Sequence, residues 1–339
     1  MDVKLTAEQQ QLLRSVKEAL DRHRSSAGAV LPYRADVAAQ HVLGDAGFLD
    51  ILEAGGSAVE ATLVVEQAAI SAPGAPTAAR ALVGPLLTGR ESLPACIALV
   101  EGRSGTVSRF APLAEAYLTI VDDEAWISER DQVDVVPEAS RWGYPVGRVE
   151  VRSGESFGPG SGEGLARLWR IGLAAEAGGL MEASTLLAKE HAASRIAFGR
   201  PIGALQAIQH RLARSFALSQ GVKWLARRAA WAPDDPAMAA AAAGYAAEGM
   251  REALSATHQV AGAIGITDEF GLLAYTARMA RLQVELGGAA AHARALARFK
   301  WPADSPVRSM IPFPPTSYRP SASLDYSETF AADQSEVGA

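Results

Sequence analysis

The sequence predicts a mainly α-helical protein with a small β region in its middle and a four-helix bundle toward its C-terminal end. Two stretches, residues 1–92 and 161–300, place apolar residues at helical spacing. Between them, residues 93–160 hold short segments rich in Val, Ile and Tyr, separated by Gly, Pro and Asp, a pattern typical of strands. These changes of period predict three domains, followed by a proline-rich, disordered tail at 301–339.

Four helical segments are predicted in the first domain. The first follows Thr6, and Leu12, Val16 and Leu20 then recur at helical spacing. Each later segment stops at a glycine or at a turn containing proline and glycine. These three segments cover 34–43, 58–70 and 77–87.

The middle domain is predicted to be small and antiparallel. Its apolar segments are three to six residues long, which suits strands and not helices. We expect strands at about 95–100, 117–121, 125–127, 133–136 and 146–151.

The third domain has helical spacing over four long segments joined by short connections. Helices of this length with short loops pack as an antiparallel bundle. The segments cover about 162–194, 204–231, 237–261 and 268–299.

Composition excludes several classes of function. The net charge is −6, and no stripe of basic and aromatic residues indicates a nucleic-acid binder. Cys96 is the single cysteine, which rules out a disulfide within the chain and argues against a cysteine-based metal site; the histidines are too scattered for a metal site. No apolar run reaches the ~18 residues of a membrane span. We expect a cytoplasmic protein with neither metal, nucleic acid nor membrane as partner.

The stretch from Arg195 to Ala213 carries the most chemistry. A helix is predicted to end near Arg195, a Phe-Gly-Arg-Pro-Ile-Gly turn follows, and a new helix opens at Gln206. A guanidinium beside carboxamides and a helix start suits a pyrophosphate, because arginine offers forked donors and the helix start adds free amides. The alternative is a helix hairpin with a solvated arginine and a capping glutamine.

This stretch resembles the acyl-CoA dehydrogenase family pattern Arg-x-x-Phe-Gly-x-Pro-Ile-x-x-x-Gln. The resemblance implies that Arg195, Phe198 and Gln206 contact the pyrophosphate–adenine half of an FAD whose flavin ring is held by a neighbouring subunit. It also implies the family's fold, with an N-terminal helical domain, a middle β-domain and a C-terminal four-helix bundle. The β-domain here is about half the usual length.

A second match lies at the end of the third predicted bundle helix. Gln259-Val-Ala-Gly-Ala-Ile-Gly-Ile-Thr is similar to the family's Gln-x-x-Gly-Gly-x-Gly-[Tyr/Phe]-Thr loop, which also contacts FAD. Gln259 and Gly262 match. Ala263 replaces the second glycine of the pair, and its methyl group is either tolerated or crowds the dinucleotide.

The resemblance leaves two places for the catalytic base. Most of the family carry it in a Glu-Gly-Thr loop, where Gly287 aligns here and Glu285 lies two residues early, so that site is absent or displaced. Other branches carry it in a Tyr-Ala-Ala-Glu context, which Tyr245-Ala-Ala-Glu248 resembles. We therefore predict Glu248 as the base; the alternative is a surface glutamate paired with Arg251 at i,i+3.

The motif that holds the flavin ring in the family is degraded here. The nearest segment, residues 99–106, keeps Glu101, Ser104 and Gly105 but not the order of the family motif. Some bacterial members that act on steroid side chains are α2β2 heterotetramers with two FADs, and this chain resembles their smaller subunit. The resemblance thus implies FAD-dependent α,β-dehydrogenation of an acyl-CoA, in steroid or lipid catabolism, with a full-length partner subunit and an electron-transferring flavoprotein as acceptor. The alternatives are a non-catalytic subunit that completes a partner's FAD site, and a homo-oligomeric scaffold.

Overall fold

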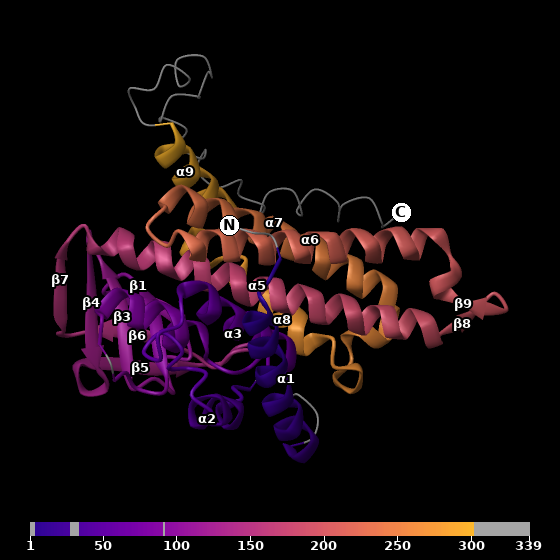
Figure 1. The fold of residues 1–339 in the computed structure, drawn as a ribbon, viewed down its shortest axis with the longest axis horizontal. Coiled ribbons are helices and arrows are strands. Elements are labelled where there is room, and N and C mark those ends of the chain that lie inside the picture. Colours follow the sequence, from indigo (N-terminus) through magenta and orange to yellow (C-terminus); the bar gives the residue numbers. More distant parts are fainter. Residues whose placement is uncertain (1–3, 28–33, 91, 302–339) are drawn as a thin grey trace, which may run out of the picture. The chain divides into compact units, whose positions relative to one another are not determined.

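Residues 1–299 form one compact unit of the chain. The computed structural model describes residues 4–27, 34–90 and 92–301. Figure 1 shows the ribbon of this unit, with helices at both ends of the sequence and strands between them. Except for residue 301, the predicted disordered tail lies outside the described residues.

The N-terminal helices agree with the predicted segments. Thr6 accepts a hydrogen bond from the amide of Gln9 at the start of the first helix, and Ser57 forms a capping box with Glu60 at the start of the third. The last predicted segment begins as a π-helix and continues as a short α-helix, because Pro85 follows Gly84 at the junction. The elements are α1 (Ala7–Ala27), α2 (Val37–Asp45), α3 (Ala58–Ser71), η1 (Ala79–Val83) and α4 (Gly84–Thr88).

The middle of the chain forms two sheets, and the prediction of a wholly antiparallel domain is wrong. β1 (Ile97–Glu101) pairs with β3 (Ala116–Val121) in parallel, because the chain enters the other sheet between them. One sheet has the order β1-β3-β4-β7, with β4 at Glu124–Glu129 and β7 at Glu155–Pro159; the other is β2-β6-β5, at Ser104–Arg109, Val146–Val151 and Val133–Glu138. β2 and β7 escaped prediction because Gly, Ser and charged residues dominate them.

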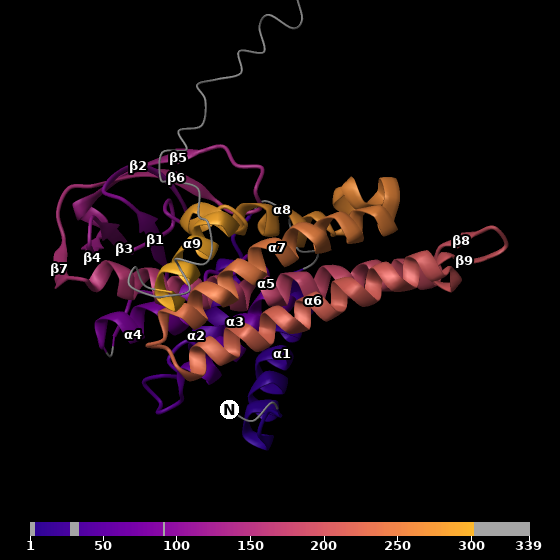
Figure 2. The same ribbon diagram turned by 90° about the horizontal axis from the view of Figure 1, so that it is seen from above.

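Three long helices make up most of the bundle: α5 (Ser161–Ser194), α6 (Gln206–Trp231) and α7 (Pro236–Ala261). They run alongside one another in both ribbon views (Figures 1 and 2). The predicted fourth helix is broken into α8 (Leu273–Leu282) and α9 (Gly288–Lys300). The break occurs because Leu286, Gly287 and Gly288 have φ values of 50°, 78° and 66°, which no α-helix accommodates.

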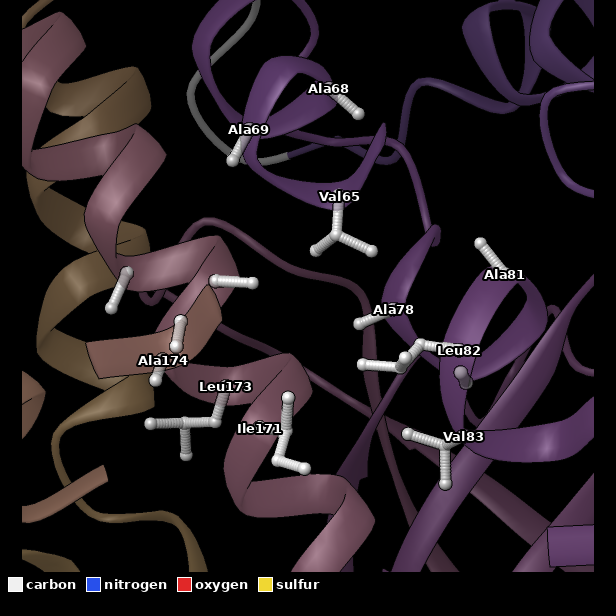
Figure 3. Packing of buried hydrophobic residues seen from close by; sticks show 14 of the residues in the cluster. Val65, Ala68, Ala69, Ala78, Ala81, Leu82, Val83, Ile171, Leu173 and Ala174 are labelled. Carbon is white, nitrogen blue, oxygen red and sulfur yellow. The ribbon is translucent and has the colours of Figure 1, made fainter. Parts of the chain in front are cut away.

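The core joins the N-terminal helices to the bundle through α5. Figure 3 shows buried side chains of α3, η1 and α5, among them Val65, Leu82 and Ile171, packed together. Glycines on α5 let these elements approach closely. A Cβ at Gly172 would lie 3.2 Å from that of Ala78, and one at Gly179 would lie 2.7 Å from that of Ala69 and closer still to the carbonyl oxygen of Glu66.

Gly179→Ala is expected to lower the free energy of unfolding by about 1–3 kcal/mol, because the new methyl group meets backbone that cannot move aside cheaply. Gly164→Ala on the same helix is the matched control. A Cβ there meets no atom within 4 Å, so the gain in helix propensity, at most about 1 kcal/mol, should stabilise the chain. Denaturant unfolding of the two variants checks the difference. Equal effects would show that α5 does not pack this tightly on α3.

Candidate functional site

The two stretches that resemble FAD-binding motifs meet at one end of the bundle, which we call the bundle end: residues 195–206 and 259–266. α5 stops there, a short hairpin of β8 (Ile196–Ala197) and β9 (Arg200–Pro201) follows, and a 3₁₀ turn, η3 (Ile202–Ala204), leads into α6. A small apolar cluster ties α5, α6, α7 and η3 together: Ala188, Ala192, Val260, Ile202, Ile208 and Leu212. The hairpin and the end of α7 lie on the same side of the bundle in both views (Figures 1 and 2).

The hairpin presents an aromatic side chain to the outside. Phe198 and Gly199 form its two-residue turn with φ values of 55° and 73°, as in a type I′ turn. A phenylalanine is strained in this left-handed region, and its side chain is 89% exposed. A large apolar group held out in a costly conformation is typical of a residue that contacts a ligand or another chain.

Three polar side chains at the bundle end are exposed to solvent. Within the described residues, the side chains of Arg195, Gln206 and Gln259 make no hydrogen bond or ion pair, and all three are exposed. The N-terminus of α6 has no side-chain cap, and the amides of Ile208 and Gln209 in its first turn donate to the carbonyl of Leu205. A free guanidinium, two free carboxamides and the positive end of a long helix together suit a pyrophosphate.

The loop after α7 completes this end. Gly262 has φ 64° and ψ −145°, a conformation that favours glycine. Ala263, the departure from the family's glycine pair, is exposed, so its methyl group crowds nothing within the chain. The residues of the bundle end therefore fit the pyrophosphate–adenine half of FAD.

Glu248, the predicted base, lies on the outer face of α7. Its side chain is 62% exposed, and its carboxylate pairs with Arg251 at 3.3 Å. It lines an open hollow between α6 and α7 with Leu218 and Tyr245. A carboxylate in water beside an arginine lacks the dry surroundings that would make it a base. Its pairing with Arg251 is the surface alternative that the i,i+3 spacing allows.

A different set of charges is buried where the three predicted domains meet. We call it the central ion cluster: Arg109 at the end of β2, Tyr144, Trp169 and Glu176 on α5, and Glu285 between α8 and α9. Each is at most 8% exposed. Arg109 Nη1 donates to both oxygens of Glu176 at 3.0 and 3.1 Å, and its Nη2 donates to Glu285 Oε2 at 3.2 Å.

The remaining lone pairs of this cluster are also engaged. Trp169 Nε1 donates to Glu285 Oε2 at 3.0 Å, and the Tyr144 hydroxyl donates to Glu176. Burial raises the pKa of Glu285, but Arg109 and Arg281 outweigh burial and the net pKa is lowered. Glu285 occupies the loop where most of the family carry the base, yet a low pKa and occupied oxygens make it a poor one.

Little space remains around the central ion cluster. The cavity that it lines, with Thr77, Ile97 and Phe110 on its other sides, has a volume of about 20 Å³. Such a volume holds about one water molecule. Neither a flavin ring nor a thioester fits in this cavity.

The segment that resembles a degraded flavin-binding motif has a structural role. Residues 99–106 form the connection from β1 to β2, and Glu101 accepts a hydrogen bond from the amide of Leu286 at 2.8 Å. Glu101 thus anchors the loop that carries Glu285. Sequence reasoning missed Arg109 and Glu176, because Arg109 is 67 residues from Glu176 and 176 from Glu285, and no local pattern links them.

Across residues 4–27, 34–90 and 92–301, no group of three metal-ligating side chains lies together. In the same ranges, every helix is too short or too polar to cross a membrane.

A helical bundle joined to a small two-sheet β region defines the fold class of the protein. Comparison with known proteins identifies the family. Residues 165–299 match the family model for the acyl-CoA dehydrogenase C-terminal domain. The chain is 30% identical over 243 residues to the acyl-CoA dehydrogenase IpdE2 of Mycobacterium tuberculosis, covering 66% of this chain and 72% of that one. The chain belongs to the acyl-CoA dehydrogenase family, whose members are flavin-dependent oxidoreductases.

Solved structures share its fold. The ChsE4-ChsE5 complex from Mycobacterium tuberculosis matches with a TM-score of 0.72 at 21% identity, over 88% of this chain and 98% of that one. The Tcur3481-Tcur3483 steroid acyl-CoA dehydrogenase variant matches with a TM-score of 0.73 at 18% identity, over 86% and 97%. A glutaryl-coenzyme A dehydrogenase in complex with glutaryl-CoA matches with a TM-score of 0.70 at 18% identity, over 88% and 96%.

Proposed function

We propose that this chain is a subunit of a hetero-oligomeric, FAD-dependent acyl-CoA dehydrogenase and that it supplies binding groups, not a reaction site of its own. Its bundle end holds the pyrophosphate–adenine half of an FAD whose flavin ring lies in a full-length partner. The assembled complex dehydrogenates an acyl-CoA between its α and β carbons, and FAD, when bound, would accept the hydride.

One observation carries this proposal: the central ion cluster occupies the place where the resemblance puts the reaction. A family member that reacts in its own pocket needs room for flavin and thioester and a carboxylate free to take a proton. Here Glu285 accepts hydrogen bonds from Arg109 and Trp169, and the cavity has a volume of about 20 Å³. At the bundle end, in contrast, the side chains of Arg195, Gln206 and Gln259 have no partner among the residues that the structure describes.

The relatives support the subunit arrangement and the class of substrate. Two of the structural relatives are named as pairs of chains, one of them as a steroid acyl-CoA dehydrogenase. A CoA thioester from steroid or lipid breakdown is the substrate class that agrees with these names. An electron-transferring flavoprotein is the acceptor that the family resemblance supports.

The flavin content of purified protein tests the arrangement. The chain expressed alone should be colourless, and the complex with a co-expressed full-length acyl-CoA dehydrogenase should contain one FAD for each pair of unlike chains. Flavin absorbance and chain stoichiometry measure both. FAD at one per chain on the isolated protein would contradict the proposal.

Glu248→Gln separates this proposal from the alternative in which the chain supplies the base. Because Glu248 contacts only an exposed arginine, a pairing worth at most about 1 kcal/mol, the complex should keep its activity within about fivefold. A catalytic base would cost roughly a hundredfold to ten-thousandfold. Single-turnover reduction of the flavin by acyl-CoA measures this, and a loss of that size would restore Glu248 as the base.

A further inference from the structure

The loop Gly262–Ile266 at the bundle end has an outer and an inner side. Gly262 and Ala263 are exposed on the outer side, whereas Gly265 is buried. A Cβ at Gly265 would lie 2.9 Å from that of Ala261 and 3.3 Å from Nδ1 of His258. The imidazole of His258 thus lies directly beneath the loop. Gly265 is small because the chain packs against it from inside, not only because a ligand approaches from outside.

His258 is itself held by a hydrogen bond to α8. Its Nε2 lies 2.9 Å from Thr276 Oγ1. The Thr276 hydroxyl donates to the carbonyl of Leu272 at 3.2 Å, so it accepts the hydrogen of Nε2 from His258. This assigns the proton to Nε2 and leaves Nδ1, which faces Gly265, without one. Burial lowers the pKa of His258, in agreement with a neutral ring.

The far side of the same segment has a second anchor. Phe270, in the turn η5 (Asp268–Phe270), packs edge-to-face on His191 of α5, with ring centroids 5.2 Å apart and planes at 71°. The segments on the two sides of the loop are therefore held in place: His258 before it is bonded to α8, and Phe270 after it packs on α5.

We propose that His258 is a positioning residue for the cofactor: it holds the Gly262–Ile266 loop so that Gly262 and Ala263 face the adenosine–pyrophosphate half of FAD. This inference rests on the proposed function. The side chain of His258 does not touch the ligand; it acts through the backbone of the loop. The bond to Thr276 supplies the rigidity, because a hydrogen bond on the far side of the ring prevents its rotation away from Gly265.

Thr276→Val, which removes the hydroxyl and keeps the shape, tests the inference. The variant loses both bonds of the hydroxyl, and of these the bond from His258 is the one that joins α7 to α8. Loss of that bond costs about 0.5–1.5 kcal/mol, so amide hydrogen exchange at residues 262–267 of the isolated chain should rise about two- to tenfold. FAD dissociation from the assembled complex should rise by a similar factor. Thr276→Ser, which restores the hydroxyl, should return both values to wild type.

Thr257→Val is the matched control. Thr257 is buried one residue before His258, and its hydroxyl bonds only to backbone carbonyls of its own helix. It should change the melting temperature as much as Thr276→Val while leaving exchange at the loop unchanged. The inference is overturned if Thr276→Val leaves the loop unchanged or if both variants change it alike. If the wild-type complex holds no FAD, the proposed function fails instead, whatever the exchange shows.

Discussion

Arg109→Met is expected to lower the free energy of unfolding by about 3–5 kcal/mol. The variant keeps most of the apolar volume of the side chain but removes the guanidinium that bonds both Glu176 and Glu285. Both carboxylates are at most 6% exposed, so water cannot replace the lost partner. Denaturant unfolding near neutral pH measures the loss. The deficit should shrink as the pH falls, because Arg109 lowers the pKa of Glu285 and its loss lets that carboxyl group take up a proton more readily.

Arg152→Met is the control for this prediction. Arg152 also lies in the β region and pairs with Asp134, but both side chains are more than half exposed. Its loss should cost less than about 1 kcal/mol. The triple variant Arg109→Met, Glu176→Gln, Glu285→Gln should recover part of the stability, because no buried charge remains unpaired. A cost for Arg109→Met no greater than that for Arg152→Met would mean that the central site is open to water.

Arg195→Ala is expected to weaken the affinity of the assembled complex for FAD. A charge-assisted contact from a guanidinium to phosphate contributes about 1.5–3 kcal/mol, which corresponds to a ten- to hundredfold weaker affinity. Since Arg195 is exposed and has no partner among the described residues, its removal should leave the melting temperature of the isolated chain unchanged. Flavin fluorescence on dilution of the complex measures the affinity. Arg195→Lys should fall between the two, because lysine keeps the charge but loses the forked donors.

Arg251→Ala provides the comparison for Arg195. Arg251 is equally exposed and carries the same charge, but it lies on the outer face of α7 beside Glu248. Its loss should leave the affinity for FAD unchanged. If both variants lose FAD alike, the effect is one of net charge, and the bundle end is not the binding site.

The contrast between Arg195 and Glu248 shows what kind of site a sequence can reveal. Arg195, Phe198 and Gln206 lie within one hairpin and the helix that follows, so their arrangement depends on local backbone and on a Phe-Gly turn. Such local features can be recognised in the sequence. That they bind FAD stays a prediction.

Glu248 shows the opposite case. Helix α7 carries alanine or glycine on nearly every side, so apolar spacing does not say which face is buried. The neighbours Ala246, Ala247 and Gly249 are indeed buried, while Glu248 between them points outward. The sequence does not settle which face of α7 is buried because small residues pack on any face, and the position of α5 and α6 decides which one; that Glu248 is the base stays a prediction.

By itself the sequence determined the helical ends and the strand-rich middle of the chain, the family, and the open hairpin at the bundle end. These depend on periodicity and on short stretches of contiguous residues. Tertiary structure alone decided that the fourth bundle helix breaks, that β1 and β3 run parallel, and that Arg109 meets Glu176 and Glu285 in a closed centre. The reason is physical: burying charges together requires groups from β2, α5 and the α8–α9 loop to converge, and only the packed chain brings such distant segments within hydrogen-bond distance.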